Sequence, residues 1–487
     1  MTPFAIGKQS FRNMEGIEQL KDIPSTRSRR PLHSVLMRSA TLLLFTIFFL
    51  FSVACHQEQG TDTTTVLIEE LGLTEQEVID SWVYAIARYL VIRQEHIDLS
   101  EEGIDYNVIK FNELGKADFV NPNLDVAYLE AWLGVDGQSP VILEIPGIEG
   151  RYYTVQIMDE WGDILYNINE RNFPMYPHGM YSLCLKGSDP LIPEDALRLD
   201  LPSQKAKMVA RIERGGDDEG AVRLQREFKI TTPREPNIAP AVVIPMFSNA
   251  NLLTVDAFDQ PMLNAVLSSA PDAMSVAPEM QEKARAVAGF IAKDEANRAI
   301  IENIIAQNAV PSVAQYLRSS GDAWGGWLAT TGKPTGFGDD FRFRAAVNYA
   351  GIWWNNNKEA VYYIGQTDSS GNTLNGDNVY VLHIKEEELP QRHVNAFWSL
   401  TLLSLPDYRV VPNILDRYHF NNLSDLSYEP DGSLKLYVAA VPPWAAPTTN
   451  WLPAPKDRSF TLTLRMYAPK EEVISGEYYA PPIEKSL

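Results

Sequence analysis

Hydrophobic positions follow a helical spacing in the segment LTEQEVIDSWVYAIARYLVIRQEHI. Thr74 precedes the apolar stripe and Glu77 follows three residues later, which is typical of a capping box at a helix N-terminus. The apolar side chains then recur every three or four residues, at Val78, Trp82, Ala85, Ile86, Leu90 and Ile92. This pattern predicts one amphipathic helix whose stripe packs onto the first domain.

From about Asn121 the hydrophobic period changes to two. Short β-rich runs bounded by Gly, Pro and Asn follow one another to about Glu213, including PVILEIPG, RYYTVQIMDEWGDILYNI, MYSLCLKG and KAKMVARIE. This alternation favours successive strands of an antiparallel sheet. The first domain is therefore expected to be mostly β.

Between Asp217 and about Gly321 the pattern is helical again, and beyond Gly336 strands return. Ala- and Glu-rich runs with Asp or Pro at plausible helix starts predict a helical connector. The later runs AVYYIGQTD, NVYVLHI, AFWSLTLLS, SLKLYVAAV and SFTLTLRMYA are separated by turn sequences. Strands at this spacing favour a sandwich or jelly roll.

These patterns predict a mainly β protein with helical elaborations, of the α+β class. Two β-sandwich or jelly-roll-like domains are joined by a helical connector. The expected boundaries are an N-terminal extension with a signal peptide at 1–54, a polar tether at 55–66, a β domain with its leading helix at 67–215, the connector at 216–335 and the second β domain at 336–487. The length of 487 residues agrees with two large domains.

The charge balance limits the possible partners. The formal net charge is -21, and nucleic acids and anionic lipids both require a positive field, so neither is expected as a partner. The chain has only two cysteines, Cys55 and Cys184, which supports neither an internal disulfide framework nor a cysteine-based zinc site. A small molecule or glycan remains the expected ligand, and the sequence defines no oligomeric state.

The first 55 residues predict export. The run LLLFTIFFLFSVAC, Leu42 to Cys55, is uncharged and short for a membrane span, as in the apolar core of a signal peptide. Met37 and Arg38 stand shortly before it, so we expect translation to start at Met37. In every case the body of the protein is expected outside the cytoplasm.

Three processing outcomes remain open. SVAC is similar to a bacterial lipobox, in which Cys55 would be lipidated, although Ser52 stands where that pattern usually has leucine. Ser52 and Ala54 also suit plain signal-peptide cleavage, and an uncleaved anchor is the third outcome. The protein is accordingly expected to be periplasmic, anchored to the outer membrane as a lipoprotein, or secreted. Contact with a membrane is expected only through an N-terminal lipid or an uncleaved signal.

Familiar catalytic and cofactor motifs are absent from the sequence. There is no G-x-S-x-G, no G-x-G-x-x-G after a strand and no H-E-x-x-H. The histidines of the exported part lack ligand spacing, namely His56, His96, His178, His383, His393 and His419. We therefore expect no cofactor and no metal site.

Polar and aromatic side chains gather at strand ends in the first β region. NPNLDVAYLEAW and GRYYTVQIMDEWGD supply the candidates, which are Asn123, Asp125, Tyr128, Arg151, Tyr153, Asp159 and Glu160. If the two segments are neighbours, Asp125 and either Asp159 or Glu160 could form a carboxylate pair for general acid and base catalysis. The other four would then bind substrate. The structural alternative is that Asn123 and Asp125 cap a turn and that Arg151 pairs with Asp159.

The second β region adds arginine and tryptophan candidates. Arg344 would hold an anionic or hydroxyl-rich group, and Trp398 would stack on a ring unless it belongs to the core. Arg417 and Arg465 must find a carboxylate or a ligand if they are buried, because an unpaired buried guanidinium is costly.

The segment TTNWLPAPKDRSF is expected to cross between two strands in extended conformation, because Pro453 and Pro455 remove backbone donors. Trp451 would plug the end of the core, with Asn450 satisfying backbone groups. The alternative is that both residues line a cleft and bind substrate.

Several of these segments resemble a known pair of domains. NPNLDVAYLEAW, PVILEIPGIEGRYYTVQIMDEWGD and ARIERGGDDEGAVRLQREFKI resemble the bacterial family DUF1254. FRFRAAVNYAGIWWNNNKEAVYY, NAFWSLTL, EPDGSLKLYV and NWLPAPKDRSFTLTLRMYAP resemble DUF1214, its usual C-terminal companion. The resemblance implies two jelly-roll-like domains and frequent export in bacteria, and it implies no particular reaction.

Two functions agree with the sequence. The first is an exported hydrolase or lyase that acts on a sugar-containing or other polar small substrate in a cleft between the β domains. The second is a non-catalytic envelope lipoprotein that binds a ligand or a protein through the same cleft. Turnover of a substrate would separate the first function from the second.

Overall fold

Three large hydrophobic cores organise the chain, one in each of two β sandwiches and one in a helical region. The computed structural model describes residues 68–114, 123–319, 321–329, 336–405, 408–444 and 446–486. The predicted signal peptide, the polar tether and Cys55 lie outside these residues. Within the described ranges, no helix is both long and apolar enough to cross a membrane.

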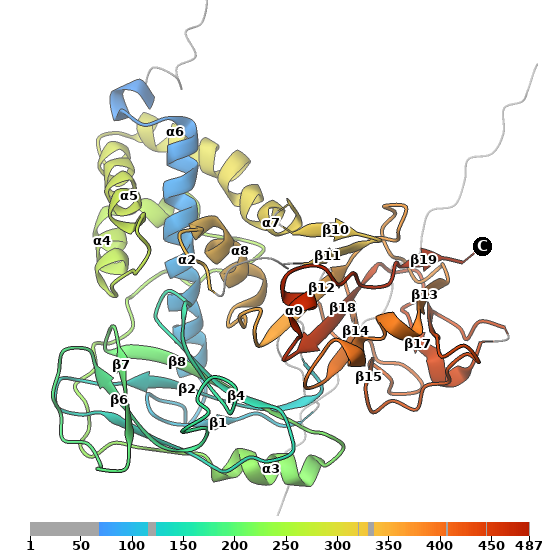
Figure 1. Cartoon of the computed structure of the whole chain (residues 1–487). Coiled ribbons are helices and arrows are strands. Elements are labelled where there is room, and N and C mark those ends of the chain that lie inside the picture. Colours follow the sequence, from blue (N-terminus) through green and yellow to red (C-terminus); the bar gives the residue numbers. More distant parts are fainter. Residues whose placement is uncertain are drawn as a thin grey trace, which may run out of the picture. The chain divides into compact units, whose positions relative to one another are not determined.

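Helix α2, Glu75–Leu99, is the centre of the helical core and is the long blue helix in Figure 1. The predicted capping box is confirmed, because Thr74 Oγ1 accepts a hydrogen bond from the Glu77 amide at 3.3 Å and Glu77 Oε2 accepts one from the Thr74 amide at 2.9 Å. The apolar stripe of α2 packs mainly on other helices rather than on the first sandwich. That part of the prediction was wrong.

The other helices of this core lie around α2. In chain order they are the short η1 (Val255–Phe258), α4 (Gln260–Ser268), α5 (Ala277–Ile291), α6 (Glu295–Ile304), the π-helical turn η2 (Ile305–Ala309), α7 (Val310–Ser319) and α8 (Phe341–Gly351). Asp259, Asp294 and Asp340 cap α4, α6 and α8 by accepting hydrogen bonds from first-turn amides. Both α8 and α5 pack directly against α2 (Figure 1).

The first sandwich consists of two sheets. The five-stranded sheet has the order β1 (Lys110–Phe111), β2 (Val126–Gly134), β8 (Lys205–Glu213), β4 (Tyr153–Met158) and β5 (Ile164–Ile168). The four-stranded sheet has the order β7 (Leu197–Leu201), β6 (Gly179–Leu185), β3 (Val141–Ile145) and β9 (Lys229–Thr231). Helix α3, Asp218–Glu227, links β8 to β9. Because β9 pairs with β3, this sandwich continues to Thr231.

The second sandwich also consists of two sheets. The six-stranded sheet has the order β10 (Asp322–Trp324), β11 (Trp327–Ala329), β12 (Ala360–Gly365), β18 (Phe460–Tyr467), β14 (Trp398–Ser404) and β15 (His419–Asn421). The four-stranded sheet has the order β17 (Trp451–Pro453), β16 (Leu434–Ala439), β13 (Tyr380–Ile384) and β19 (Glu484–Lys485). Short helical turns lie between strands, namely η3 (Glu386–Glu388), η4 (Pro390–Arg392), η5 (Thr448–Asn450) and α9 (Glu471–Ile474). The chain is thus mixed α and β, with the predicted two β-rich domains.

Candidate functional site

The outer faces of the two larger sheets carry rows of polar side chains. Alternate residues of each strand point into the sandwich core, so their neighbours point away from it. On the first sheet, one outward row crosses β2, β8 and β4 at Tyr128, Arg211 and Thr154. On the second sheet, one outward row crosses β12, β18, β14 and β15 at Tyr362, Arg465, Ser399 and Asn421.

A small apolar cluster joins these two faces. Its buried members are Val126, Tyr152, Ala360, Phe397, Tyr467 and Ala468, which come from both sandwiches. Phe397 stacks on Tyr467 with ring centroids 4.4 Å apart, and Tyr152 meets Tyr467 edge to face at 5.4 Å. The Tyr467 hydroxyl accepts a 2.6 Å hydrogen bond from Asn123 Nδ2. The junction between the domains is therefore packed at its centre and polar around it.

Asp125 and His419 meet at this junction. His419 Nε2 lies 2.9 Å from Asp125 Oδ1, and Asn421 Nδ2 donates to the same oxygen at 2.7 Å. Asp125 is held in a turn before β2, because its amide donates to Asn123 Oδ1 at 2.7 Å and its carbonyl accepts from the Arg214 amide at 2.8 Å. The structural alternative, in which Asn123 and Asp125 cap a turn, agrees with this geometry. The turn aims the carboxylate at the second domain.

A cavity of about 180 Å³ opens beside this pair. It is lined by Asp125, Glu213 and Arg214 from the first sandwich and by Phe397, His419 and Asn421 from the second. Asp125 is 6% exposed and the His419 side chain is 21% exposed. The imidazole is therefore the more accessible of the two groups.

The charges around the cavity are partly compensated. Burial acts to raise the pKa of Asp125, but hydrogen bonds from His419 and Asn421 outweigh it and leave the pKa below its usual value. Burial raises the pKa of Glu213, and the nearby Asp125 carboxylate raises it further. Arg214 pairs with Asp218 at 2.6 Å. Asp125 is thus ionised at neutral pH.

The hydrogen bond to Asp125 sets the tautomer of His419. A carboxylate only accepts hydrogen bonds, so Nε2 of a neutral imidazole carries the proton and Nδ1 keeps a lone pair. Among the described residues, no side chain or backbone group hydrogen bonds to Nδ1. Asp125 would also stabilise the imidazolium that forms when Nδ1 takes up a proton. The pair is arranged as a base with an orienting carboxylate.

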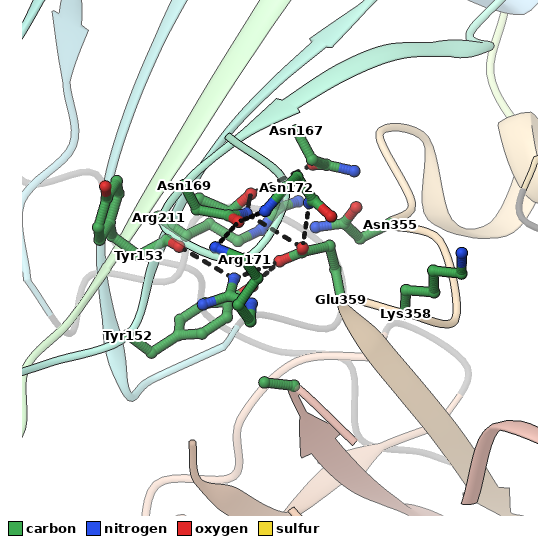
Figure 2. A network of polar contacts seen from close by, with 12 residues as sticks. Tyr152, Tyr153, Asn167, Asn169, Arg171, Asn172, Arg211, Asn355, Lys358 and Glu359 are labelled. Atoms are coloured by element: carbon green, nitrogen blue, oxygen red, sulfur yellow. Dashed lines mark hydrogen bonds and ion pairs between the residues drawn. The ribbon is translucent and has the colours of Figure 1, made fainter. Parts of the chain in front are cut away.

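Glu359 forms the second polar connection between the domains, shown in Figure 2. It precedes β12 and is 1% exposed. Its Oε1 accepts hydrogen bonds from Asn169 at 3.0 Å and Asn172 at 2.8 Å, and its Oε2 accepts from Arg171 at 2.7 Å and the Tyr152 hydroxyl at 3.0 Å. All four donors belong to the first sandwich. Glu359 therefore fixes the second domain against the first, next to the site.

Asp159 and Glu160 do not converge with Asp125. Asp125 precedes β2, whereas Asp159 and Glu160 follow β4, and both strands run antiparallel to β8. Parallel strands place these residues at opposite ends of the sheet, so the predicted carboxylate pair does not form.

Asp159 and Glu160 lie in the interior, where other contacts engage them. Asp159 Oδ1 accepts from the Trp161 and Asp163 amides, both at 2.9 Å, and Glu160 pairs with Arg88 at 2.8 Å. Burial and the neighbouring Asp163 raise the pKa of Asp159 to about 7.

Arg344 lies in the same interior region, away from the cavity. It is 0% exposed, and its two Nη atoms bind the two Asp272 oxygens at 2.9 and 2.8 Å. Its guanidinium also stacks over Trp161, 4.4 Å from the ring centroid. This buried pair engages both Nη atoms of Arg344, so the position does not favour the predicted substrate contact.

The remaining first-domain candidates are dispersed. Arg151 pairs with Asp217 at 2.9 Å, not with Asp159 as the structural alternative expected. The Tyr153 hydroxyl donates to the Pro177 carbonyl at 2.6 Å within the sandwich core. Tyr128 lies at the junction, where Arg211 is 5.5 Å from its ring centroid. Of these three candidates, only Tyr128 lies at the domain junction.

The second-domain candidates are mostly structural. Trp398 is 1% exposed within the sandwich core. Arg417 donates to the Thr448 and Trp451 carbonyls at 2.5 and 2.8 Å. Asn450 donates to the Ser427 and Lys435 carbonyls at 2.7 and 2.9 Å, and Trp451 Nε1 donates to the Ala439 carbonyl at 2.8 Å. These contacts agree with a structural role for the proline-flanked segment. The predicted continuous extended crossing is wrong in part, because Thr448–Asn450 is a helical turn and Trp451–Pro453 is an edge strand paired with β16.

Sequence reasoning did not select His419, Asn421, Arg211 or Glu359. His419 follows Asp125 by 294 positions, and no spacing rule connects residues that far apart. The described residues contain no group of three or more His, Cys, Asp or Glu side chains placed to hold a metal ion. The one signal available was local, because His419 and Asn421 alternate along DRYHFN and so share a strand face.

Comparisons with known proteins support the two-domain division. Residues 107–232 match the family described as protein of unknown function (DUF1254), and residues 359–471 match protein of unknown function (DUF1214). The first match covers most of the first sandwich, and the second covers most of the second sandwich. A search of curated proteins gave no significant match.

One solved structure at low sequence identity shares the fold. The crystal structure of the VPA0106 protein from Vibrio parahaemolyticus has a TM-score of 0.59 at 20% identity, covering 85% of this chain and 100% of that one. An uncharacterized protein from Burkholderia cenocepacia has a TM-score of 0.40 at 13% identity, covering 87% of this chain and 96% of that one. The order of the two matches leads to one conclusion: the chain carries a DUF1254 domain followed by a DUF1214 domain, as the sequence resemblance predicted.

Proposed function

We propose that the protein is an exported hydrolase or lyase that acts on a sugar-containing or other polar small substrate between the two sandwiches. The observation that carries this proposal is the 2.9 Å contact between Asp125 and His419 beside a cavity. An imidazole oriented by a buried carboxylate is a common general base, because the carboxylate fixes its tautomer and offsets the charge that develops.

The proposed chemistry is proton abstraction by Nδ1 of His419. In a hydrolase the proton comes from water, which then attacks the substrate, whereas in a lyase it comes from a substrate carbon. The imidazolium that forms can return the proton to a leaving group. A cavity of about 180 Å³ is smaller than the 300–1,000 Å³ typical of drug-sized ligands, so it suits one ring or the reacting end of a substrate.

Export is part of the proposal and rests on the sequence. The basic, apolar and small-residue regions from Met37 to Cys55 occur in the order of an export signal. A lipidated Cys55 would tether the body of the protein to the envelope through QEQGTDTTT. Its substrate would then be a small molecule or glycan of the cell exterior.

The test is substrate conversion with a matched control. Purified protein is incubated with a periplasmic extract and with a library of glycans, and the products are identified by mass spectrometry. We expect His419→Asn to lower turnover by at least about 100-fold, the usual contribution of a general base.

His393→Asn is the control, because His393 also contacts a carboxylate, Glu472 at 3.0 Å, and lies outside the cavity. Saturable binding without conversion by the wild type would favour the binding lipoprotein instead. Equal turnover by His419→Asn and the wild type would remove His419 from the mechanism.

A further inference from the structure

Arg211 is a buried cation on the outer face of the first sandwich. It lies on β8 between Tyr128 and Thr154 of the neighbouring strands and is 6% exposed. Its Nη1 donates to Gln156 Oε1 at 2.6 Å and its Nη2 donates to the Trp353 carbonyl at 3.0 Å. A guanidinium has five N–H groups, so these neutral acceptors use only part of its capacity.

Four of the other buried cations have a carboxylate partner, whereas Arg93 donates to Asn249 Oδ1 at 2.8 Å. Arg88 pairs with Glu160 at 2.8 Å, Arg344 with Asp272 at 2.8 Å, Lys205 with Glu95 at 2.8 Å and Lys207 with Asp98 at 2.7 Å. Arg211 forms no ion pair with any carboxylate in the part of the chain that the structure describes. A buried charge without a counter-charge is costly, and an arginine cannot lose its proton to avoid that cost.

Tyrosines surround Arg211 where the two sandwiches meet. Tyr128 lies beneath the guanidinium, and Tyr362 and Tyr467 face it from the second sandwich. Burial raises the pKa values of Tyr362 and Tyr467, so these phenols are neutral and do not compensate the charge. The Tyr362 side chain is half-buried and so retains some exposure to solvent.

A strained backbone turn holds Arg211 in place. Trp353 has a φ of 68°, a left-handed conformation that is unusual for a large side chain. Its carbonyl accepts from Arg211, and the next carbonyl, of Trp354, accepts from Gln156 Nε2 at 2.6 Å. Strain of this kind persists where the surrounding structure requires it, and it is concentrated at ligand sites. The guanidinium is thus fixed before any ligand arrives.

We propose that Arg211 is the anchor of an anion site between the sandwiches and that its ligand is a small organic monocarboxylate. One uncompensated guanidinium matches one negative charge. A flat carboxylate fits the planar donor fork by two parallel hydrogen bonds, and tyrosine rings suit the organic part of the ligand. The proposal is independent of turnover at the Asp125 and His419 pair.

The experiment measures thermal unfolding of the full chain with acetate and benzoate as probes, at ionic strength matched with sodium chloride. A ligand that binds only the native state raises the Tm in a saturable manner. We expect this rise in the wild type, its loss in Arg211→Met, and an apparent Kd at least tenfold weaker in Arg211→Lys, which keeps the charge without the fork. Arg417→Met is the control and should respond as the wild type does, because the Arg417 guanidinium donates to the Thr448 and Trp451 carbonyls and lies over the Phe420 ring.

A second measurement is the Tm without ligand. Arg211→Met leaves only the neutral acceptors Gln156 Oε1 and the Trp353 carbonyl without their donor, whereas Arg344→Met leaves the Asp272 carboxylate without its counter-charge. Arg211→Met should therefore lower the Tm less than Arg344→Met does. The proposal is overturned if acetate and benzoate fail to raise the Tm of the wild type, or if they raise the Tm of Arg211→Met by the same amount. A larger rise in the Tm of the wild type with inorganic phosphate than with acetate or benzoate would overturn the assignment of a monocarboxylate as the ligand.

Discussion

Asp125 and His419 belong to different sandwiches, yet they share a 2.9 Å hydrogen bond across the domain junction. Removing the carboxylate by Asp125→Ala leaves His419 and Asn421 without their common acceptor. We expect a loss of about 2–4 kcal/mol in the free energy of unfolding at pH 7, measured by urea titration. Asp125→Asn keeps an acceptor oxygen and should lose less.

This loss should depend on pH in a defined direction. The folded-state pKa of Asp125 lies below its ordinary value of 3.8, so its stabilising effect is complete above that value and disappears as the pH falls through the folded pKa. The stabilisation that the wild type has over Asp125→Ala should therefore be lost only as the pH falls below about 4. A difference that shrinks already near pH 6 would contradict this assignment.

Glu359→Ala should be strongly destabilising. The substitution leaves the buried donors of Asn169 and Tyr152 without their acceptor and Arg171 without its ion pair, and such losses cost about 3–5 kcal/mol in the free energy of unfolding. Glu386→Ala is the control, since Glu386 pairs with Arg392 at the surface. This substitution should lower the free energy of unfolding by less than about 1 kcal/mol. Chemical denaturation of both variants checks the prediction, and similar losses in the two would refute it.

Asp159→Asn should stabilise the protein in alkaline solution. Because burial raises the pKa of Asp159 from 3.8 to about 7, the native state holds its proton longer than the unfolded state. Its contribution to stability is therefore complete below about pH 4 and is lost as the pH rises through about 7.

Asparagine retains the oxygen that accepts from the Trp161 and Asp163 amides and carries no charge. The gain in the free energy of unfolding of Asp159→Asn over the wild type should be on the order of a few kcal/mol at pH 8 and close to zero at pH 4. Thermal melts at both pH values measure it. Asp272→Asn should be destabilising at pH 8, because the Asp272 pKa is lowered by Arg344.

Cys55 should carry lipid if the lipobox is used. Expression in a bacterial host with a labelled fatty acid should give a labelled protein, and Cys55→Ser should remove the label. Mass spectrometry of the N-terminus is the complementary measurement. A peptide that spans Met37 and reaches toward Met1 would contradict a start at Met37.

Local patterns predicted most of the fold. The capping box at Thr74, the alternation of the strands and the extended proline segment are decided by residues that are close in sequence, so the chain itself indicates them. The packing of α2 was mispredicted because an apolar stripe shows which face is buried but not which element covers it.

The site was harder to predict for the same reason. Asp125 was selected, but its partners His419 and Asn421 lie 294 and 296 positions away. Arg211 occurs in KAKMVARIE, where a polar residue at an alternate position is typical of a solvent-facing strand. Arg211 is buried only because the second sandwich lies against that face.

The meeting of two polar sheet faces has a consequence for inheritance. Neither matched domain alone encloses the junction, because Arg211 and Asp125 come from one and His419 and Glu359 from the other. A gene that lost either half would encode one sandwich whose polar face is exposed to water. Only one member of the Asp125–His419 pair and one member of the Glu359–Arg171 pair would remain. Selection for whatever occurs at the junction therefore acts on the two halves as one unit and keeps them in a single reading frame.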